Sequence, residues 1–198
     1  GESMNKRVSK SLCTVMAVIA IVTGWQAQYK TNPETLPAEV KQVMTSKAGN
    51  QLRFSQKAFE IIGDAESCRR DAYQCPARIW TAGIGHTGKG VKPDLKDIPL
   101  ETIPLWFISD TMEAQNCIEQ NLERPPLKKL PQGVFDAIGS LIFNTGCKNI
   151  INSTLAKFIK AGEYIKACYQ LPRWNKAAGK EQPGLVIRRG KEIGRAHV

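Results

Sequence analysis

Three side chains between residues 64 and 88 have types and spacing that could carry out chemistry. Glu66, Cys75 and Thr81 are separated by eight and then by five residues. A glutamate held in a partly apolar cleft keeps its proton near neutral pH and can act as a general acid. A thiolate can stabilise positive charge or assist attack, and its use depends on what lowers its pKa from about 8.5. Thr81 has no useful acidity, so we expect it to position water or substrate.

A histidine five residues after Thr81 leaves a second chemistry open. His86 could form a dyad with Cys75, as in a peptidase or amidase. A lone glutamate near a helix end is also most often a solvated charge. The two histidines, His86 and His197, do not complete a zinc-ligand spacing with the cysteines. We therefore expect neither a metal site nor a cofactor.

Six cysteines in 198 residues indicate disulfides and an oxidising compartment, since none of them forms a CxxC pair. Cys68 and Cys75 can close a disulfide if their Cα atoms come within about 7 Å. At most one pair can form among Cys117, Cys147 and Cys168. We favour Cys117 with Cys147, because both fall near the ends of adjacent predicted helices.

The net charge of +10 predicts attraction to polyanions. Nucleic acid, anionic lipid and anionic cell-wall polymer all carry the complementary charge. The basic residues are spread along the chain and form no motif for binding DNA or RNA. The charge therefore indicates general attraction, and nucleic acid is not an expected partner.

The N-terminal region resembles a weak membrane segment. Residues 1–3 look like a cloning scar, and the natural segment would then be 4–29. Within it, a positive flank precedes 19 uncharged residues, 11–29. A membrane span needs about 20 predominantly apolar residues, so insertion would be marginal and reversible. The flank predicts a cytoplasmic N-terminus with the rest of the chain outside.

Two details of this segment matter for function. A cleaved signal peptide is disfavoured, because cleavage after Ala27 would put bulky Trp25 where a small residue is needed. Cys13 lies inside the apolar run. It is either an ordinary core cysteine or a thiol that is hidden in lipid and available once the segment leaves.

The periodicity beyond this segment predicts an α+β protein. Residues 30–50 read as a linker with two helical turns over 38–46. Apolar spacing predicts a helix over 54–65, which Ser55 can cap and which ends just before Glu66. Residues 78–85 read as one strand of a small hairpin or sheet, followed by glycine-rich turns. Further helical patterns cover residues 105–122, 134–145, 153–160, 163–171 and 183–193.

Blocks beyond the three spaced residues resemble the phage-type lysozymes, glycoside hydrolase family 24, over residues 51–195. W-T-A-G-I-G-H-T-G resembles the strand after the family's catalytic threonine. F-N-T-G-C (143–147) resembles its F-N-x-G turn, and S-T-L (153–155) and the block 173–189 resemble the C-terminal block of its lambdoid members. The second catalytic position is commonly a carboxylate. A subset of the family has a cysteine there, as this chain does.

This resemblance implies a lysozyme-like fold with a small β-containing lobe and a larger all-helical lobe, formed by a catalytic domain over 51–198. It implies a muramidase that hydrolyses the bond between N-acetylmuramic acid and N-acetylglucosamine in peptidoglycan and so lyses the bacterial host. Glu66, Cys75 and Thr81 would be catalytic. His86 would form a supporting ion pair with Asp110, and Phe143 and Ser153 would be substrate-cleft candidates.

The run E-x-C-R-R-D-x-Y-x-C-P, with a cysteine in the weak membrane segment, resembles the signal-anchor-release endolysins. The resemblance implies an enzyme tethered to the host inner membrane and held inactive in the periplasm by a Cys68–Cys75 disulfide. On release, Cys13 would exchange into that bond, pair with Cys68 and free Cys75. We expect a monomer.

Two alternatives stay open. Cys68–Cys75 could be a permanent structural bridge. The chain could also be a non-catalytic, membrane-tethered module that binds the wall without cleaving it.

Overall fold

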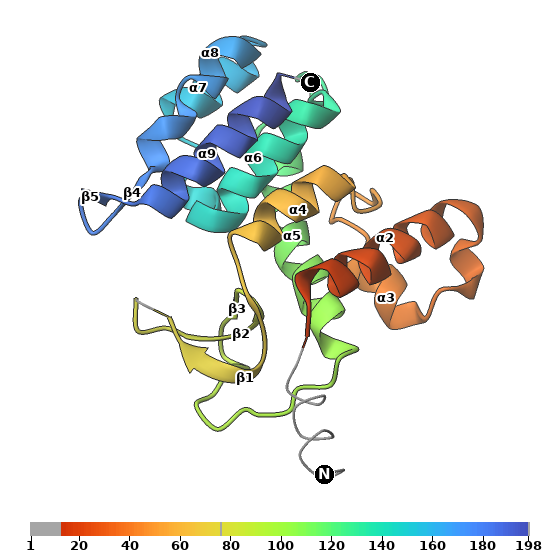
Figure 1. Cartoon of the computed structure of the whole chain (residues 1–198). Coiled ribbons are helices and arrows are strands. Elements are labelled where there is room, and N and C mark those ends of the chain that lie inside the picture. Colours follow the sequence, from red (N-terminus) through yellow and green to blue (C-terminus); the bar gives the residue numbers. More distant parts are fainter. Residues whose placement is uncertain (1–12, 76, 198) are drawn as a thin grey trace. The chain divides into compact units, whose positions relative to one another are not determined.

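The computed structural model describes residues 13–75 and 77–197. These residues form helices and two small antiparallel sheets, joined by loops (Figure 1). The predicted α+β class is confirmed. Contacts divide the chain into two units. The first comprises Gly1–Met44 and Glu66–Asp110, and the second comprises Thr45–Ala65 and Thr111–Val198. Each unit is described by itself below.

The sheet of the first unit contains β1 (Cys68–Gln74), β2 (Trp80–Ile84) and β3 (His86–Thr87), in that order. Cys68 lies opposite Ile84 and Gln74 opposite Trp80, with one irregularity in the register. The predicted strand over 78–85 is confirmed as β2, whose residues 81–84 are buried. The sequence pattern predicts no strand at β1, because C-R-R-D-A-Y-Q lacks an alternation of apolar and polar residues.

The segment 95–98 forms hydrogen bonds along the free edge of β1. The amide of Ala72 donates to Leu95 O at 2.8 Å, and the amide of Ile98 donates to Arg70 O at 3.0 Å. The buried Arg70 side chain returns a bond from Nε to Ile98 O at 2.7 Å. These bonds satisfy edge groups that a strand would otherwise expose. Long-range hydrogen bonds therefore hold β1 in place, rather than its own apolar pattern.

Three helical elements precede the sheet in the first unit: α2 (Val15–Thr31), η1 (Pro33–Thr35) and α3 (Ala38–Val43). Thr14 caps α2 by accepting a bond from the Ala17 amide. The two helical turns expected over 38–46 are present as α3. Within residues 13–75 and 77–197, none of the helices has the length and apolar content that a membrane span requires.

The second unit is mostly helical, and α6 forms its centre (Figure 1). All residues of α6 from Gly133 to Ile142 are buried. Both α4 and α9 pack against α6, and α7 packs against α8. The elements are α4 (Gln56–Asp64), α5 (Thr102–Asn121, which begins in the first unit), α6 (Gln132–Thr145), η2 (Cys147–Asn149), α7 (Thr154–Lys160), α8 (Tyr164–Cys168), η3 (Leu171–Trp174), β4 (Lys176–Ala177), β5 (Lys180–Glu181) and α9 (Pro183–Ala196).

Three features that the sequence predicts at helix starts in the second unit are present. Ser55 caps α4 by accepting a bond from the Ala58 amide. Ser153 caps α7 in the same way, and Pro183 is in the first turn of α9. Short polar side chains and proline mark these starts in the sequence because they satisfy or remove unpaired amides.

A buried carboxylate ties three of these helices together. Asp136 on α6 has no exposed surface and accepts bonds from both the amide and the hydroxyl of Ser55, at the start of α4. It also accepts a bond from Gln132 Nε2 at 2.8 Å and from Arg195 Nε, near the end of α9, at 2.8 Å. Asp136 thus compensates its own burial with charged and polar donors.

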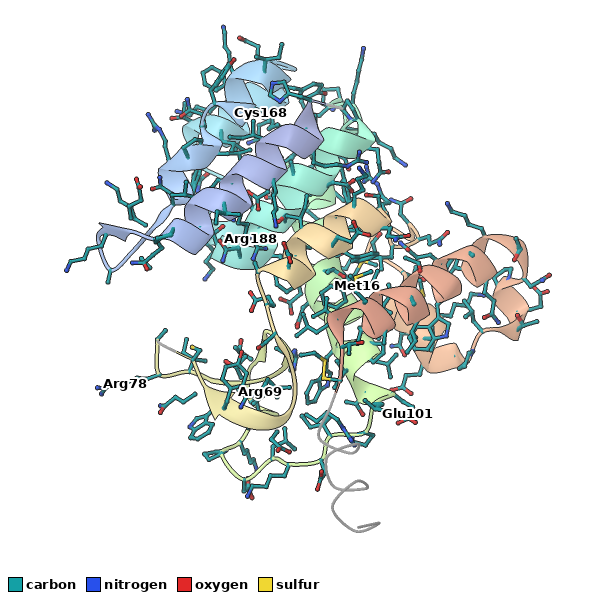
Figure 2. The ribbon with its side chains drawn as sticks, in the orientation of Figure 1. Met16, Arg69, Arg78, Glu101, Cys168 and Arg188 are labelled. Atoms are coloured by element: carbon teal, nitrogen blue, oxygen red, sulfur yellow. A yellow bond between two sulfur atoms is a disulfide. The ribbon has the colours of Figure 1, made fainter. Side chains whose placement is uncertain are left out.

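A disulfide between Cys117 on α5 and Cys147 in η2 lies within the second unit. This is the pairing that the sequence favours among Cys117, Cys147 and Cys168. Cys168, at the end of α8, remains a buried free thiol (Figure 2).

Candidate active site

Glu66 lies just beyond a helix end, as the sequence predicts. Helix α4 ends at Asp64, and Glu66 is half-buried between that end and the first residue of β1. Its carboxyl group lies against Gly85, which directly follows β2. A Cβ atom placed on Gly85 would be 2.9 Å from Glu66 Oε2 and 3.0 Å from Cδ. Glycine at this position therefore leaves the space that the carboxyl group occupies.

Cys75 begins the tight turn between β1 and β2. Its amide donates to Ile79 O at 3.0 Å, and the amide of Arg78 donates to Cys75 O at 2.8 Å. Arg78 has a positive φ of 60° and lies at the tip of the hairpin in Figure 2. The Cys75 thiol is free and half-exposed, so solvent and small molecules can reach it.

The turn lowers the pKa of the Cys75 thiol below its usual value. The main cause is a hydrogen bond from the Ile79 amide, which stabilises the thiolate. Partial burial opposes the shift, while the Ala77 amide and the Thr81 hydroxyl add to it. Cys75 is therefore a thiol that ionises more readily than a free cysteine.

Thr81 is buried on β2, directly opposite Tyr73 of β1. Its hydroxyl lies 3.1 Å from Ile79 O and forms a hydrogen bond with the Cys75 thiol. The hairpin thus brings Cys75 and Thr81 together, although five residues separate them in the sequence. Their contact is compatible with Thr81 orienting the sulfur.

His86 pairs with Asp110 of α5. His86 Nδ1 lies 2.9 Å from Asp110 Oδ2 and 3.1 Å from Oδ1, and the His86 ring stacks on Trp106 with centroids 4.4 Å apart. Burial raises the pKa of the Asp110 carboxyl, and the bond to His86 partly offsets this effect. The expected pair is present. Its contacts join His86 to α5, whereas the groups that act on the Cys75 sulfur are Ile79, Ala77 and Thr81.

Cys13 and Cys68 form a disulfide, with Cα atoms 5.5 Å apart. The bond joins the residue before the Thr14 cap of α2 to the first residue of β1. Cys75 consequently has no disulfide partner in this structure. The Cys68–Cys75 bridge, which the sequence leaves open as a permanent structural bond, is not the arrangement observed.

The two cleft candidates, Phe143 and Ser153, belong to the second unit. Phe143, near the end of α6, has the Arg188 guanidinium 5.9 Å from its ring centroid. The Ser153 hydroxyl donates to Ile150 O at 2.6 Å and accepts from the Ala156 amide. This hydroxyl is therefore used in capping α7, and contact of either residue with substrate stays a prediction.

Sequence reasoning missed a buried charged cluster in the second unit. Arg189 and Glu192 on α9 are 1% and 0% exposed, and Ser140 Oγ of α6 donates to Glu192 Oε1 at 2.6 Å. Arg189 Nη2 also donates to Asn144 Oδ1 at 2.9 Å. The spacing of Arg188, Arg189 and Glu192 along one helix face is a sequence signal for such a cluster. Among the described residues, no group of His, Cys, Asp and Glu side chains could hold a metal ion.

The chain is similar to known lytic proteins of phages. It is 34% identical to the SAR-endolysin of Escherichia phage P1 over 162 residues, which cover 76% of this chain and 85% of that protein. It is 33% identical to the SAR-endolysin of Haemophilus phage HP1 over 153 residues, covering 72% and 80%.

Solved structures of a phage endolysin are also similar to this chain. The active form of P1 phage endolysin Lyz matches with a TM-score of 0.70 and 29% identity over 94% of each chain. The secreted inactive form of the same endolysin matches with a TM-score of 0.52 and 32% identity, over 73% of this chain and 95% of that one. The profile of the Phage lysozyme family matches residues 63–192, which include Glu66, Cys75 and Thr81. The chain belongs to the phage lysozyme family.

Proposed function

We propose that this protein is a muramidase endolysin. It hydrolyses the bond between N-acetylmuramic acid and N-acetylglucosamine in peptidoglycan and lyses the bacterial host. Membership of the phage lysozyme family and the SAR-endolysin relatives support this activity. The main structural support for this site is the space that Gly85 leaves for the Glu66 carboxyl group. Beside it, the hairpin places Thr81 within hydrogen-bonding distance of Cys75.

Each of the three side chains has a distinct role in the proposed reaction. Glu66 delivers a proton to the oxygen of the leaving sugar as the glycosidic bond breaks. The Cys75 thiolate faces the positive charge that develops on the sugar ring and stabilises it, or assists the attack on it. Thr81 orients Cys75 through its hydroxyl and positions the water that completes hydrolysis.

The same sulfur serves as the leaving group in an activating exchange. Before release, a Cys68–Cys75 disulfide blocks the site. The Cys13 thiolate attacks Cys68 Sγ, a Cys13–Cys68 bond forms, and Cys75 leaves as a thiolate, so the number of disulfides is unchanged. The observed Cys13–Cys68 bond and the free Cys75 correspond to the product of this step. In this product, the lowered pKa of Cys75 stabilises the thiolate that has left.

The place of action follows from this cycle. The N-terminal segment, residues 4–29, holds the enzyme on the periplasmic side of the host inner membrane until it leaves the bilayer. The released monomer then reaches the peptidoglycan. Its net charge of +10 favours approach to an anionic cell wall.

Glu66→Gln tests the activity. The released protein with its Cys13–Cys68 bond should lose roughly 10²-fold or more of its rate, the usual contribution of a general acid. Digests of purified peptidoglycan should show new reducing sugars with the wild-type enzyme. Full clearing of cell walls by the variant would show that Glu66 is not the acid. New amino groups instead of reducing sugars would identify a peptidase or amidase, and binding without products would identify a wall-binding module.

A further inference from the structure

Gly85 has no room for a side chain beside the carboxyl group of Glu66, the proposed acid. A Cβ atom on Gly85 would lie 2.9 Å from Oε2, 3.0 Å from Cδ and 3.4 Å from Cγ of Glu66. A Cβ atom essentially never lies within 3.0 Å of a non-bonded atom, so the first of these distances excludes a side chain at this position. Gly85 also has a φ of +66°, in the left-handed region that glycine adopts readily. Only a residue without a side chain at position 85 therefore leaves room for the Glu66 carboxyl group where it now lies.

The backbone of Gly85 is held on both sides. Before it, Ile84 pairs with Cys68 across β1 and β2. After it, His86 pairs with Ala82 in the turn between β2 and β3. The His86 side chain is fixed further by Asp110 Oδ2 at 2.9 Å and by the stacked ring of Trp106. Gly85 is thus a fixed part of the backbone beside the Glu66 carboxyl group.

We propose that Gly85 is a positioning residue for Glu66, and that the His86–Asp110 pair keeps Gly85 in place. The proposal rests on the proposed function, in which Glu66 is the general acid. It gives the histidine pair a purpose: His86 acts on the acid through the backbone, one residue away, without touching the substrate.

A methyl group on Gly85 would displace Glu66 rather than the strand. The closest atoms it would meet are the far end of the Glu66 side chain, whereas the backbone of Gly85 is held at both neighbours. The added methyl group would therefore change the position of the Glu66 carboxyl group. A misplacement of about 1 Å can lower a rate by around 10²-fold.

Gly83 provides a matched control within the same motif. Its φ of +60° is close to that of Gly85, so alanine meets the same backbone strain at both positions. A Cβ atom on Gly83 would lie 3.4 Å from Trp106 Cε3, an ordinary contact, with no carboxyl group beside it. Any effect of Gly85→Ala beyond that of Gly83→Ala therefore reports the contact with Glu66.

The experiment compares Gly85→Ala and Gly83→Ala in the released, full-length protein, using soluble peptidoglycan fragments. We expect kcat of Gly85→Ala to fall about 10²-fold further than that of Gly83→Ala, with KM within about twofold and equal melting temperatures. Equal kcat values, or a loss of kcat that follows the melting temperature, would overturn the proposal. Asp110→Asn should also lower kcat with little change in KM.

A shorter acid gives an independent readout. In Glu66→Asp, the carboxyl carbon takes roughly the place of Cγ, farther from the added methyl group. Gly85→Ala should then lower kcat several-fold less in the Glu66→Asp background than in the wild type, a coupling that a purely structural role would not produce. Additive losses would contradict the proposal. If Glu66→Gln alone stays fully active, the proposed function fails, and a Gly85-specific loss of kcat would then belong to another acid.

Discussion

Cys68 and Cys75 stand at opposite ends of the same strand. Cys68 is the first residue of β1, and Cys75 directly follows its last residue, Gln74. At about 3.3 Å per residue, a strand of this length separates the two Cα atoms by roughly 20 Å. A disulfide tolerates only about 7 Å. The proposed inactivating Cys68–Cys75 bond and strand β1 therefore exclude each other.

We predict that Cys13→Ser leaves the protein in a form without β1. Lacking Cys13, the variant keeps Cys68–Cys75, stays inactive after release from the membrane, and recovers activity with added reductant. The amides of Ala72 and Ile98, which bond to Leu95 O and Arg70 O in the structure described above, should exchange with solvent rapidly in this variant.

Hydrogen exchange followed by mass spectrometry measures this difference. Protection of the buried helix α6 should stay the same in both proteins and serves as the internal control. Equal protection of β1 in both, or full activity of Cys13→Ser without reductant, would rule out the exchange mechanism.

The Cys75 thiol should react with iodoacetamide at lower pH than an ordinary cysteine. Its pKa is lowered, chiefly by the Ile79 amide. Because the thiolate is the reactive form, the alkylation rate should rise as the pH passes through this lowered pKa. Burial raises the pKa of Cys168, which should react slowly and supplies a reference in the same molecule.

Thr81→Val should move the midpoint of Cys75 alkylation to higher pH, because it removes a bond that favours the thiolate. Thr87→Val is the matched control, since Thr87 is exposed on the neighbouring strand opposite Thr81. Rates resolved by residue with mass spectrometry report the midpoints. An identical shift in both variants would mean that the Thr81–Cys75 bond has no influence on the thiol.

Asp136→Ala should destabilise the second unit strongly. The substitution leaves Arg195, the Ser55 amide and Gln132 without their buried acceptor. Breaking a buried charge pair costs about 3–5 kcal/mol. Ser55→Ala removes only the helix cap and its hydroxyl bond, so a loss of about 1 kcal/mol is expected. Denaturant unfolding compares the two, and a similar small loss for both would show that Asp136 contributes little.

Replacing Cys117 and Cys147 together by alanine should lower stability without altering activation. The disulfide joins residues 30 positions apart. Its loss is expected to cost about 3–4 kcal/mol through the greater freedom of the unfolded chain. Cell-wall lysis at low temperature should stay near the wild-type rate, because Cys13, Cys68 and Cys75 are untouched. A loss of lysis at temperatures where the variant is folded would contradict this separation.

The sequence predicts the helices well, because their apolar spacing and caps are local signals. Ser55, Ser153 and Pro183 mark helix starts that the structure contains. Strand β1 is not predictable in this way. Its residues are mostly polar, and its position depends on backbone bonds to Leu95 and Ile98, more than 20 residues away along the chain.

The candidate site, like the fold, can be predicted only in part from the sequence. The spacing of Glu66, Cys75 and Thr81, together with the family resemblance, identifies the residues. It cannot reveal that the amides of Ala77 and Ile79 act on the thiol, since that depends on the shape of a turn. The space that Gly85 leaves for Glu66 and the burial of Glu192 also cannot be predicted from the sequence. Each depends on residues that become neighbours only in the folded chain.

The burial of Cys168 determines where oxidative damage would fall. Two disulfides use four cysteines, and Cys168 is 3% exposed, whereas Cys75 is half-exposed. Peroxide, a small disulfide or the thiol of a second molecule therefore meets Cys75 first. Under the proposed mechanism, such a reaction would end lysis because it caps the Cys75 sulfur. If the proposed mechanism holds, each molecule in an oxidising compartment works only for as long as this one sulfur atom stays unmodified.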